Sequence, residues 1–484
     1  MPKRAAFFLV AVSAFVLFGE VPPRGSGQAP SPRAEAAELI SALKADSYQA
    51  AARLADKLLA DPALDAGTMA FCGLAVLLGG RVDEAEAILD KAIARSPDDP
   101  QAHLGLGRIA RIRNDMDGAV SHLRRAVPSA ELYGPALRLL WRAAWDLGPV
   151  DDLFGIYKLA EERYARESRP LPSWFSNGLG QIKGLAGKRL FEMTGRFERL
   201  TVPLETTTPQ ARIRMIDLKL NGKGEYPFHI DSASADFLTL SPLQAADLGL
   251  ALTGSSTAVG VGTAEPVVRF AVLDKVEIGP VTFRNVPVMV SDIRPLRGLR
   301  EGLIGTALLK RFNVTIDVET GTMDLFPLDR PDLLAARVDR KAVATDVPLY
   351  LFDATTVGAA VAGAPPALYI LDSAAATNLV DAPFFAEHIK PGIDPARIVP
   401  RGIRGAGGEQ TVNMVDGIRI SLGPLAFDGQ TICEFPMDTL NMMGGRYLAG
   451  LVGNPLLWPY RVHMDFKNGR LILEERPLEK ARPR

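Results

Sequence analysis

The sequence predicts a multidomain protein in which an α-helical solenoid of repeats precedes an all-β region with two similar lobes. Residues 34–167 are rich in alanine and leucine, show helical periodicity and repeat a pattern after 34 residues. From residue 195 onward the segments become short, alternating and β-branched, and one series of motifs occurs twice in the same order. A chain of 484 residues is also longer than one domain of roughly 150 residues.

Composition excludes several classes of function. The formal net charge is −1, so the basic surface typical of nucleic-acid-binding proteins is not expected. The two cysteines, Cys72 and Cys433, lie far apart and give neither a zinc-binding spacing nor a disulfide framework. The five histidines show no metal-ligand spacing either. We therefore expect no metal, no cofactor and no nucleic-acid partner.

Residues 1–33 resemble a signal peptide followed by a spacer. Lys3 and Arg4 precede an apolar run over residues 5–18, and a segment rich in proline, glycine and serine follows it. The apolar run is shorter than the about 20 residues that span a bilayer. We expect export to the periplasm or the medium; the alternative is an uncleaved segment that anchors the chain to a membrane.

The helical region, residues 34–167, resembles tetratricopeptide repeats. Small and acidic residues recur at an offset of 34 residues, which is the length of one such repeat. These pairs are Gly73 and Gly107, Asp83 and Asp117, and Ala85 and Ala119. The fold itself does not name a ligand. One interpretation is a groove that binds a protein partner, and the other is a packing spacer for the neighbouring domain.

Residues 168–194 contain proline and glycine at short intervals and are predicted to be a linker. Two lobes follow it, at 195–330 and 340–476. "FHIDSASADF" around Asp231 corresponds to "YILDSAAATN" around Asp372. Each aspartate is followed by a predicted helix N-cap, Ser241 in the first lobe and Asp381 in the second.

Two further motifs follow in each lobe. A loop with glycines comes first, and a Leu-Ile-Gly or Leu-Val-Gly motif before a short helix comes later. The loop glycines are Gly260 and Gly262 in the first copy and Gly405 and Gly408 in the second; the later glycines are Gly305 and Gly453. Two such series in the same order indicate an internal duplication.

Each lobe resembles one lobe of a retropepsin-like or pepsin-like aspartic protease. The resemblance rests on "HIDSA" with "LIG" and on "ILDSA" with "LVG", and it covers about residues 195–476. It implies a bilobal acid-protease fold with both lobes in one chain, and an aspartic-type endopeptidase that acts on a polypeptide in extended conformation. Asp231 and Asp372 would be the catalytic pair.

The resemblance also implies roles for the neighbouring residues. Ser232, Ala233, Ser234, Ser373 and Ala374 would support the active loops. Gly260, Gly262, Gly405 and Gly408 would belong to flaps over the substrate, and Gly305 and Gly453 would pack beside the active loops. The family usually has glycine where this chain has Ala233 and Ala374, and a positive φ at these positions would strain an alanine.

Two juxtaposed carboxyl groups would share one proton, because like charges at short range cannot both ionise at low cost; aspartic proteases are the standard example. A water between them would then attack the peptide bond. The alternative is an inactive scaffold whose β region binds extended peptide and whose repeats bind a partner. A third interpretation makes the repeats a substrate receptor or an inhibitory cover.

Overall fold

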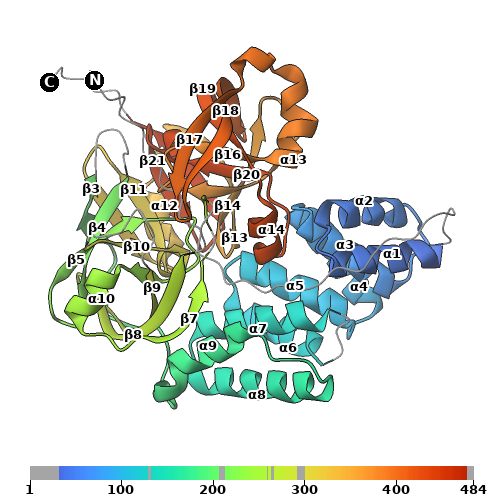
Figure 1. Cartoon of the computed structure of the whole chain (residues 1–484), viewed down its shortest axis with the longest axis horizontal. Coiled ribbons are helices and arrows are strands. Elements are labelled where there is room, and N and C mark those ends of the chain that lie inside the picture. Colours follow the sequence, from blue (N-terminus) through green and yellow to red (C-terminus); the bar gives the residue numbers. More distant parts are fainter. Residues whose placement is uncertain are drawn as a thin grey trace. The chain divides into compact units, whose positions relative to one another are not determined.

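The computed structural model describes residues 32–128, 132–206, 213–258, 260–262, 266–291 and 300–476. The predicted signal peptide lies outside these residues, apart from its last two positions. The described residues form two compact units. One is helical, and the other is built from strands, which confirms the predicted fold class (Figure 1). No helix within the described part of the chain is long and apolar enough to cross a membrane.

Among the described residues, the helical unit comprises 32–190 and Asp438–Tyr447. Its helices pack in sequential pairs, as expected for a helix–turn–helix solenoid. They are α1 (Pro32–Lys44), α2 (Tyr48–Leu59), α3 (Ala66–Leu78), α4 (Val82–Arg95), α5 (Pro100–Ile112), α6 (Met116–Ala126), α7 (Tyr133–Leu147), α8 (Val150–Arg166), α9 (Ser173–Ile182) and α14 (Asp438–Gly444).

The repeated glycines explain how these helices approach one another. A Cβ atom on Gly73 in α3 would lie 2.7 Å from Leu89 Cγ in α4. A Cβ atom on Gly107 in α5 would lie 2.7 Å from Leu123 Cγ in α6. Both glycines and both leucines are separated by 34 residues, so the same close contact recurs in successive repeats.

The segment predicted to be a linker, residues 168–194, contains regular structure. Helix α9 lies within it and belongs to the helical unit, and strand β1 (Glu192–Thr194) belongs to the β unit. Trp174 and Phe175 are buried, and the Phe175 ring meets Trp141 edge-on at 5.1 Å. The prolines and glycines of the segment suggested a linker, but its aromatic residues extend the helical core by one more helix.

The β unit contains a sheet that has nine strands within the described residues. This sheet carries the loop around Asp231, the first active loop; the loop around Asp372 is the second active loop. Its order is β1-β9-β6-β10-β5-β4-β8-β7, and β3 pairs with β4. The bounds are β3 (Glu205–Thr206), β4 (Arg214–Leu220), β5 (Glu225–Ile230), β6 (Leu238–Leu240), β7 (Thr253–Thr257), β8 (Val267–Ile278), β9 (Val281–Ser291) and β10 (Gly302–Ile304).

A second sheet has thirteen strands among the described residues, in the order β17-β18-β19-β16-β20-β15-β14-β13-β22-β21-β11-β12-β2. The first lobe contributes β2 (Leu200–Pro203), β11 (Phe312–Asp317) and β12 (Thr322–Pro327). The second contributes β13 (Val343–Phe352), β14 (Ala354–Val361), β15 (Ala367–Asp372), β16 (Asn378–Asp381), β17 (Val399–Gly405), β18 (Gly408–Leu422), β19 (Leu425–Phe435), β20 (Gly450–Gly453), β21 (Tyr460–Asp465) and β22 (Arg470–Glu475).

Strands of both lobes therefore share this sheet. Strand β11 of the first lobe pairs with β21 of the second, with Val314 opposite Met464. The two strands end at Asp317 and Asp465, which follow the equivalent glycines Gly305 and Gly453 at the same distance in sequence. The pairing therefore joins equivalent parts of the duplication. This continuous backbone pairing fixes one lobe against the other.

Short helices connect the strands: α10 (Pro242–Leu248), α11 (Thr306–Leu309), α12 (Pro331–Arg337), α13 (Ala382–Phe384) and α15 (Asn454–Leu457). Ser241 caps α10 as predicted, in a reciprocal capping box with Gln244. Asp381 is the N-cap residue of α13, as predicted, but its side chain makes no capping hydrogen bond; its carboxylate accepts from the Met437 N–H at 3.0 Å instead.

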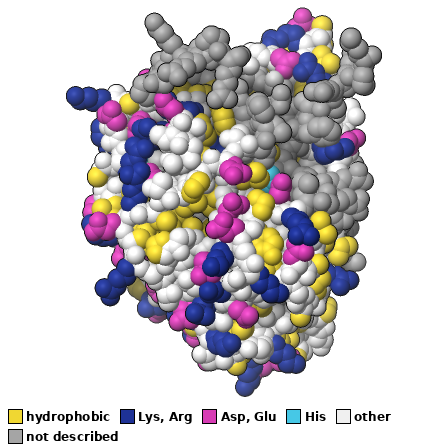
Figure 2. Space-filling model, turned by 90° about the vertical axis from the view of Figure 1, so that its left-hand side faces the viewer, with side chains coloured by type: hydrophobic (Ala, Val, Ile, Leu, Met, Phe, Trp, Pro, Cys, Tyr) yellow, Lys and Arg dark blue, Asp and Glu magenta, His cyan; other side chains and the backbone are white. Residues whose placement is uncertain are grey.

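On the face shown in Figure 2, the described side chains include charges of both signs, scattered among neutral residues. Within that described surface, basic residues do not gather into one extended patch. This agrees with the net charge of −1.

Candidate active site

Asp231 and Asp372 end equivalent strands in the two lobes. Asp231 follows β5, which pairs in parallel with β10, so that Ile230 lies opposite Ile304. Asp372 ends β15, which pairs in parallel with β20 and places Asp372 opposite Gly453. Both side chains are fully buried. The duplicated motifs thus build the same strand-to-loop transition twice.

Backbone N–H groups hold one oxygen of each carboxyl group. Asp231 Oδ1 accepts from the N–H groups of Ala233 and Ser234 at 2.9 and 3.1 Å. Asp372 Oδ1 accepts from Ala374 and Ala375 at 2.8 and 2.9 Å. The other oxygen, Oδ2, is buried in both residues and has no hydrogen-bond partner within the described part of the chain. Each carboxyl group therefore has one anchored oxygen and one oxygen available to a water or substrate.

The two active loops are joined by a reciprocal pair of hydrogen bonds. The Ser232 N–H donates to Ser373 Oγ at 3.1 Å, and the Ser373 N–H donates to Ser232 Oγ at 3.0 Å. Each hydroxyl also donates across the junction, Ser232 to the Leu371 carbonyl at 2.6 Å and Ser373 to the Ile230 carbonyl at 2.7 Å. These four bonds connect the residues on either side of both aspartates.

Alanine is compatible with the third position of each motif. Neither Ala233 nor Ala374 has a positive φ. Their role in the loop is to donate a backbone N–H to the aspartate, which alanine does as well as glycine. The methyl groups are fully buried. The departure from the usual glycine thus introduces no strained backbone conformation.

Burial and mutual repulsion perturb both carboxyl groups. Desolvation raises the pKa of Asp231 well above its usual range, and the charge of Asp372 raises it further. Desolvation also raises the pKa of Asp372, against the lowering effect of the two N–H groups bound to it. One negative charge is therefore much easier to accommodate here than two, and the titration belongs to the pair.

Gly305 and Gly453 pack directly beside the active loops. A Cβ atom on Gly305 would lie 2.1 Å from the Asp236 carbonyl oxygen, and one on Gly453 would lie 2.3 Å from the Thr377 carbonyl oxygen. Such approaches leave no space for a side chain. The two glycines bring β10 and β20 close to the loops that follow Asp231 and Asp372.

The two glycine-bearing loops meet. Gly262 and Gly407 pair in parallel, and the Gly407 N–H donates to the Val261 carbonyl at 2.8 Å. Gly262 has φ +121°, and a Cβ atom there would lie 2.1 Å from the Gly407 carbonyl carbon. Gly405 and Gly408 bound the turn between β17 and β18, and Gly260 lies two residues before Gly262.

Three supporting contacts were not predicted, two made by threonine side chains and one by a backbone N–H. Thr306 Oγ1 donates to the Ser232 carbonyl at 2.8 Å. Thr355 lies within hydrogen-bonding distance of two carbonyls, Ser232 at 2.7 Å and Leu371 at 2.8 Å. The Asn454 N–H donates to Ala375 at 2.8 Å. Thr306 follows Gly305 and Asn454 follows Gly453, so their equivalent positions in the two copies could have indicated a role at the site. Thr355 carried no such signal.

His229 has a specific partner beside the first active loop. Its Nε2 lies 2.7 Å from Glu301 Oε2, and the side chain is buried. The hydrogen bond from His229 lowers the pKa of Glu301. The pair links β5 to the residue just before β10. His229 therefore has a local packing role beside the loop that contains Asp231.

Comparisons with known proteins agree with this architecture. Residues 216–308 match the family model described as aspartyl protease, and residues 37–100 and 73–133 match the tetratricopeptide repeat. The solved structures that resemble the chain include the aspartic proteinase from Irpex lacteus, at 11% identity and a TM-score of 0.36, over 58% of this chain and 99% of that one. A search of curated proteins found no match. The resemblance to both families is confirmed for these parts of the chain.

Proposed function

We propose that the protein is an aspartic endopeptidase that hydrolyses peptide bonds with a water activated between Asp231 and Asp372. The match of residues 216–308 to the aspartyl protease family supports protease function. The observation that carries the proposal is the state of the two carboxyl groups. Each has Oδ1 fixed by two backbone N–H groups and Oδ2 buried with no partner among the residues that the structure describes, and reciprocal serine bonds join their loops.

The chemistry requires one proton on the pair. The ionised carboxylate accepts a proton from the water, whose oxygen then forms a bond to the scissile carbonyl carbon. The protonated carboxyl group donates its proton to the carbonyl oxygen, which gives a tetrahedral diol. Collapse of the diol breaks the C–N bond, and the amine leaves after it takes up a proton. No covalent bond to the enzyme forms.

The paired glycine loops supply the cover that extended substrates need. Gly262 and Gly407 meet through backbone atoms, and Val261 and Ala406 beside them are buried. A peptide in extended conformation can add its own N–H and C=O groups to such strand-like loops. Opening of the Gly262–Gly407 contact would admit the peptide, and closure would exclude water from the reaction.

Cleavage of an unfolded protein mixture between pH 3 and 8 tests the proposal. We expect cleavage by the wild type and loss of at least about 1,000-fold in Asp231→Asn and in Asp372→Asn, because each removes one of the two proton-transfer groups. Asp217→Asn is the matched control, since Asp217 is exposed on β4 of the same lobe. Cleavage that persists in either active-loop variant would contradict the proposed mechanism.

Two further proposals concern the rest of the chain. The tetratricopeptide match supports a role for the helical repeats in protein interaction. The basic and apolar N-terminal residues support export, either into the periplasm or to the outside, with membrane attachment if the segment stays uncleaved. Cell fractionation of the full chain, with N-terminal sequencing of the recovered protein, tests export: cytoplasmic protein that starts at Met1 would contradict it.

A further inference from the structure

The helical unit contains one segment from far along the chain. Asp438–Tyr447 lies between β19 and β20 in sequence, yet it packs with the helices. It consists of α14 followed by a turn at Gly445. Asn441 and Arg446 are buried. The repeats therefore already contact a peptide segment, and that segment belongs to the same chain.

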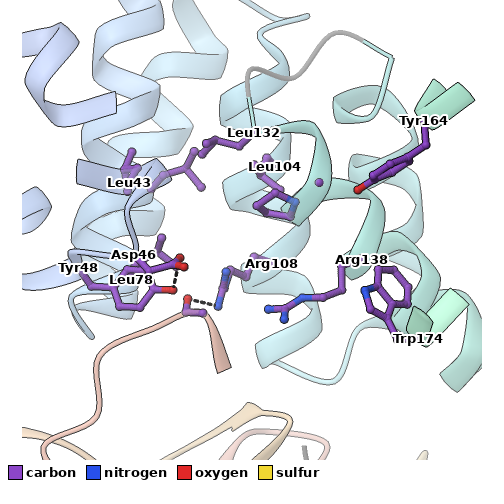
Figure 3. A pocket seen from close by; sticks show the side chains of 14 residues that line it. Leu43, Asp46, Tyr48, Leu78, Leu104, Arg108, Leu132, Arg138, Tyr164 and Trp174 are labelled. Carbon is purple, nitrogen blue, oxygen red and sulfur yellow. Dashed lines mark hydrogen bonds between the residues drawn. The ribbon is translucent and has the colours of Figure 1, made fainter. Parts of the chain in front are cut away.

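Two hydrogen bonds attach the segment to the repeats. Arg108 from α5 donates through Nη2 to the Gly445 carbonyl at 2.5 Å. The Tyr447 N–H donates to the carbonyl of Leu78, the last residue of α3, at 2.8 Å. Figure 3 shows the Arg108 bond, with Leu78 close by and Arg138 further along the same side of the pocket. Both bonds use backbone groups of the segment, as in the recognition of a peptide ligand.

Gly445 is required for this fit. Its φ of +60° belongs to the left-handed region. A Cβ atom at this position would lie 3.1 Å from Arg138 Nη2 and 3.2 Å from Arg108 Nη2. A residue with a side chain would therefore adopt a strained backbone conformation and require both guanidinium groups to shift by a few tenths of an ångström. The contact is selective for a glycine at the centre of the segment.

The segment also closes part of the groove between the repeats. A pocket of about 230 Å³ is lined by side chains of the helices and by Gly445 itself. Tyr48, Leu104 and Trp174 contribute apolar surface to it, and Arg108 contributes the charge next to Gly445 (Figure 3). A peptide partner that entered this groove would meet the segment as one of its walls.

The segment leads directly to the strand beside Asp372. After Tyr447 the chain continues through Leu448 and Ala449 into β20. The Ala449 N–H donates to the Leu368 carbonyl at 2.8 Å, and the Asp381 N–H donates to the Ala449 carbonyl at 2.8 Å. Strand β20 then pairs with β15 up to Asp372 itself. Only two residues thus separate the end of the segment from β20, the strand that supports the loop around Asp372.

We propose that the repeats recognise Asp438–Tyr447 as an internal ligand, and that Arg108 is a positioning residue for β20 and the loop of Asp372. The repeats then act on the active site of their own chain through this segment. The positioning role rests on the proposed endopeptidase function, whereas the recognition of the segment does not.

Hydrogen–deuterium exchange of the full-length protein tests the recognition. In Arg108→Ala we expect amides of residues 445–449 to exchange about 10- to 100-fold faster, since a hydrogen bond from a charged donor is lost. Arg113→Ala is the matched control, because Arg113 caps the same helix but contacts Asp83 and Glu86 on the surface. Gly445→Ala should reproduce the effect, and Gly363→Ala, with φ +78° and open space around it, should not.

Kinetics on the same variants test the positioning role. We expect Arg108→Ala to lower kcat about 10-fold or more with little change in KM, and Arg108→Lys, which keeps a donor, to recover part of the loss. Unchanged exchange at 445–449, or equal increases in Arg108→Ala and Arg113→Ala, would overturn the recognition. Faster exchange with unchanged kcat would overturn the positioning role. If the wild type cleaves nothing, the exchange experiment still decides the recognition.

Discussion

Replacement of one active-loop aspartate should stabilise the β unit, and the gain should depend on pH. In the unfolded chain both carboxyl groups titrate near 3.9. In the folded chain burial raises both pKa values, and the charge of Asp372 raises that of Asp231 further. The folded state therefore binds more protons than the unfolded state above pH 4. Stability falls as pH rises through this window, by about 1.4 kcal/mol per pH unit for each extra proton bound.

Asp372→Asn removes the contribution of Asp372, because an amide does not titrate; the carboxyl group of Asp231 and its desolvation remain. Between pH 5 and 6.5 we expect the wild type to lose stability relative to the variant by about 1.4 kcal/mol per pH unit, which corresponds to the one proton that Asp372 binds in the folded chain but not in the unfolded chain. Near pH 4 the two proteins should differ little. Between pH 5 and 6.5 the variant gains roughly 2 kcal/mol, with no change in the loop N–H groups that hold Oδ1.

Urea unfolding, monitored by hydrogen exchange, measures this difference in stability. Peptides from residues 225–240 report on the β unit alone, which avoids a mixture of transitions from two units. Asp217→Asn, at an exposed position on β4, is the control and should leave the pH profile unchanged. A stability difference between wild type and Asp372→Asn that stays constant from pH 4 to 6.5 would refute the raised pKa of Asp372 in the folded chain.

Three other substitutions test parts of the site, each measured by urea unfolding. Gly453→Ala should destabilise by roughly 2 kcal/mol or more, because its Cβ would lie 2.3 Å from the Thr377 carbonyl oxygen. Gly358→Ala, with open space around the Cβ position, should be nearly neutral. Equal effects of the two substitutions would contradict the close packing at Gly453. Ser232→Ala should cost roughly 1–3 kcal/mol, since the Ser373 N–H loses its acceptor and the Leu371 carbonyl loses one of its two hydroxyl partners. A neutral result would show that the two loops do not depend on the Ser232 hydroxyl. Arg214→Met should stabilise by roughly 1–3 kcal/mol, because Arg214 is fully buried and its guanidinium has no hydrogen-bond partner among the described residues. Arg461→Met should destabilise, since it removes the ion pairs of Arg461 with the buried carboxylates of Asp317 and Glu474. Destabilisation by Arg214→Met would show that the packing of Arg214 over Trp458 outweighs its desolvation.

The features that could be predicted from the sequence are those that occur twice in the chain. The repeated Asp-Ser-Ala motifs and the later glycines at 305 and 453 indicated two equivalent lobes, and the structure places these residues at equivalent strand ends. The 34-residue offset indicated the helix pairs, which pack through Gly73 and Gly107. In each case a local pattern occurred twice, so that one copy supported the interpretation of the other.

Contacts that occur once were not predicted. Asp381 is the N-cap residue that was predicted, but only the folded chain brings the Met437 N–H to its carboxylate. The attachment of Asp438–Tyr447 to the helices joins Arg108 to Gly445 over 337 positions of sequence. No periodicity or motif relates two such segments. Their contact depends on the tertiary arrangement, which composition and spacing do not specify.

The two lobes also differ at one equivalent position, and that difference concerns the active loops. Met215 pairs with His229 and Thr356 pairs with Ile370, so Arg214 in the first lobe corresponds to Thr355 in the second. Thr355 lies within hydrogen-bonding distance of the carbonyls of Ser232 and Leu371, one from each active loop. The Arg214 guanidinium has no hydrogen-bond partner in the described residues and lies 5.4 Å from the centre of the Trp458 ring. The second lobe therefore supplies a polar support that the first lacks, and Thr306 supplies the first lobe's own bond to Ser232. Because the supports differ while the Oδ1 contacts are the same, Asp231 and Asp372 are held alike but are not interchangeable.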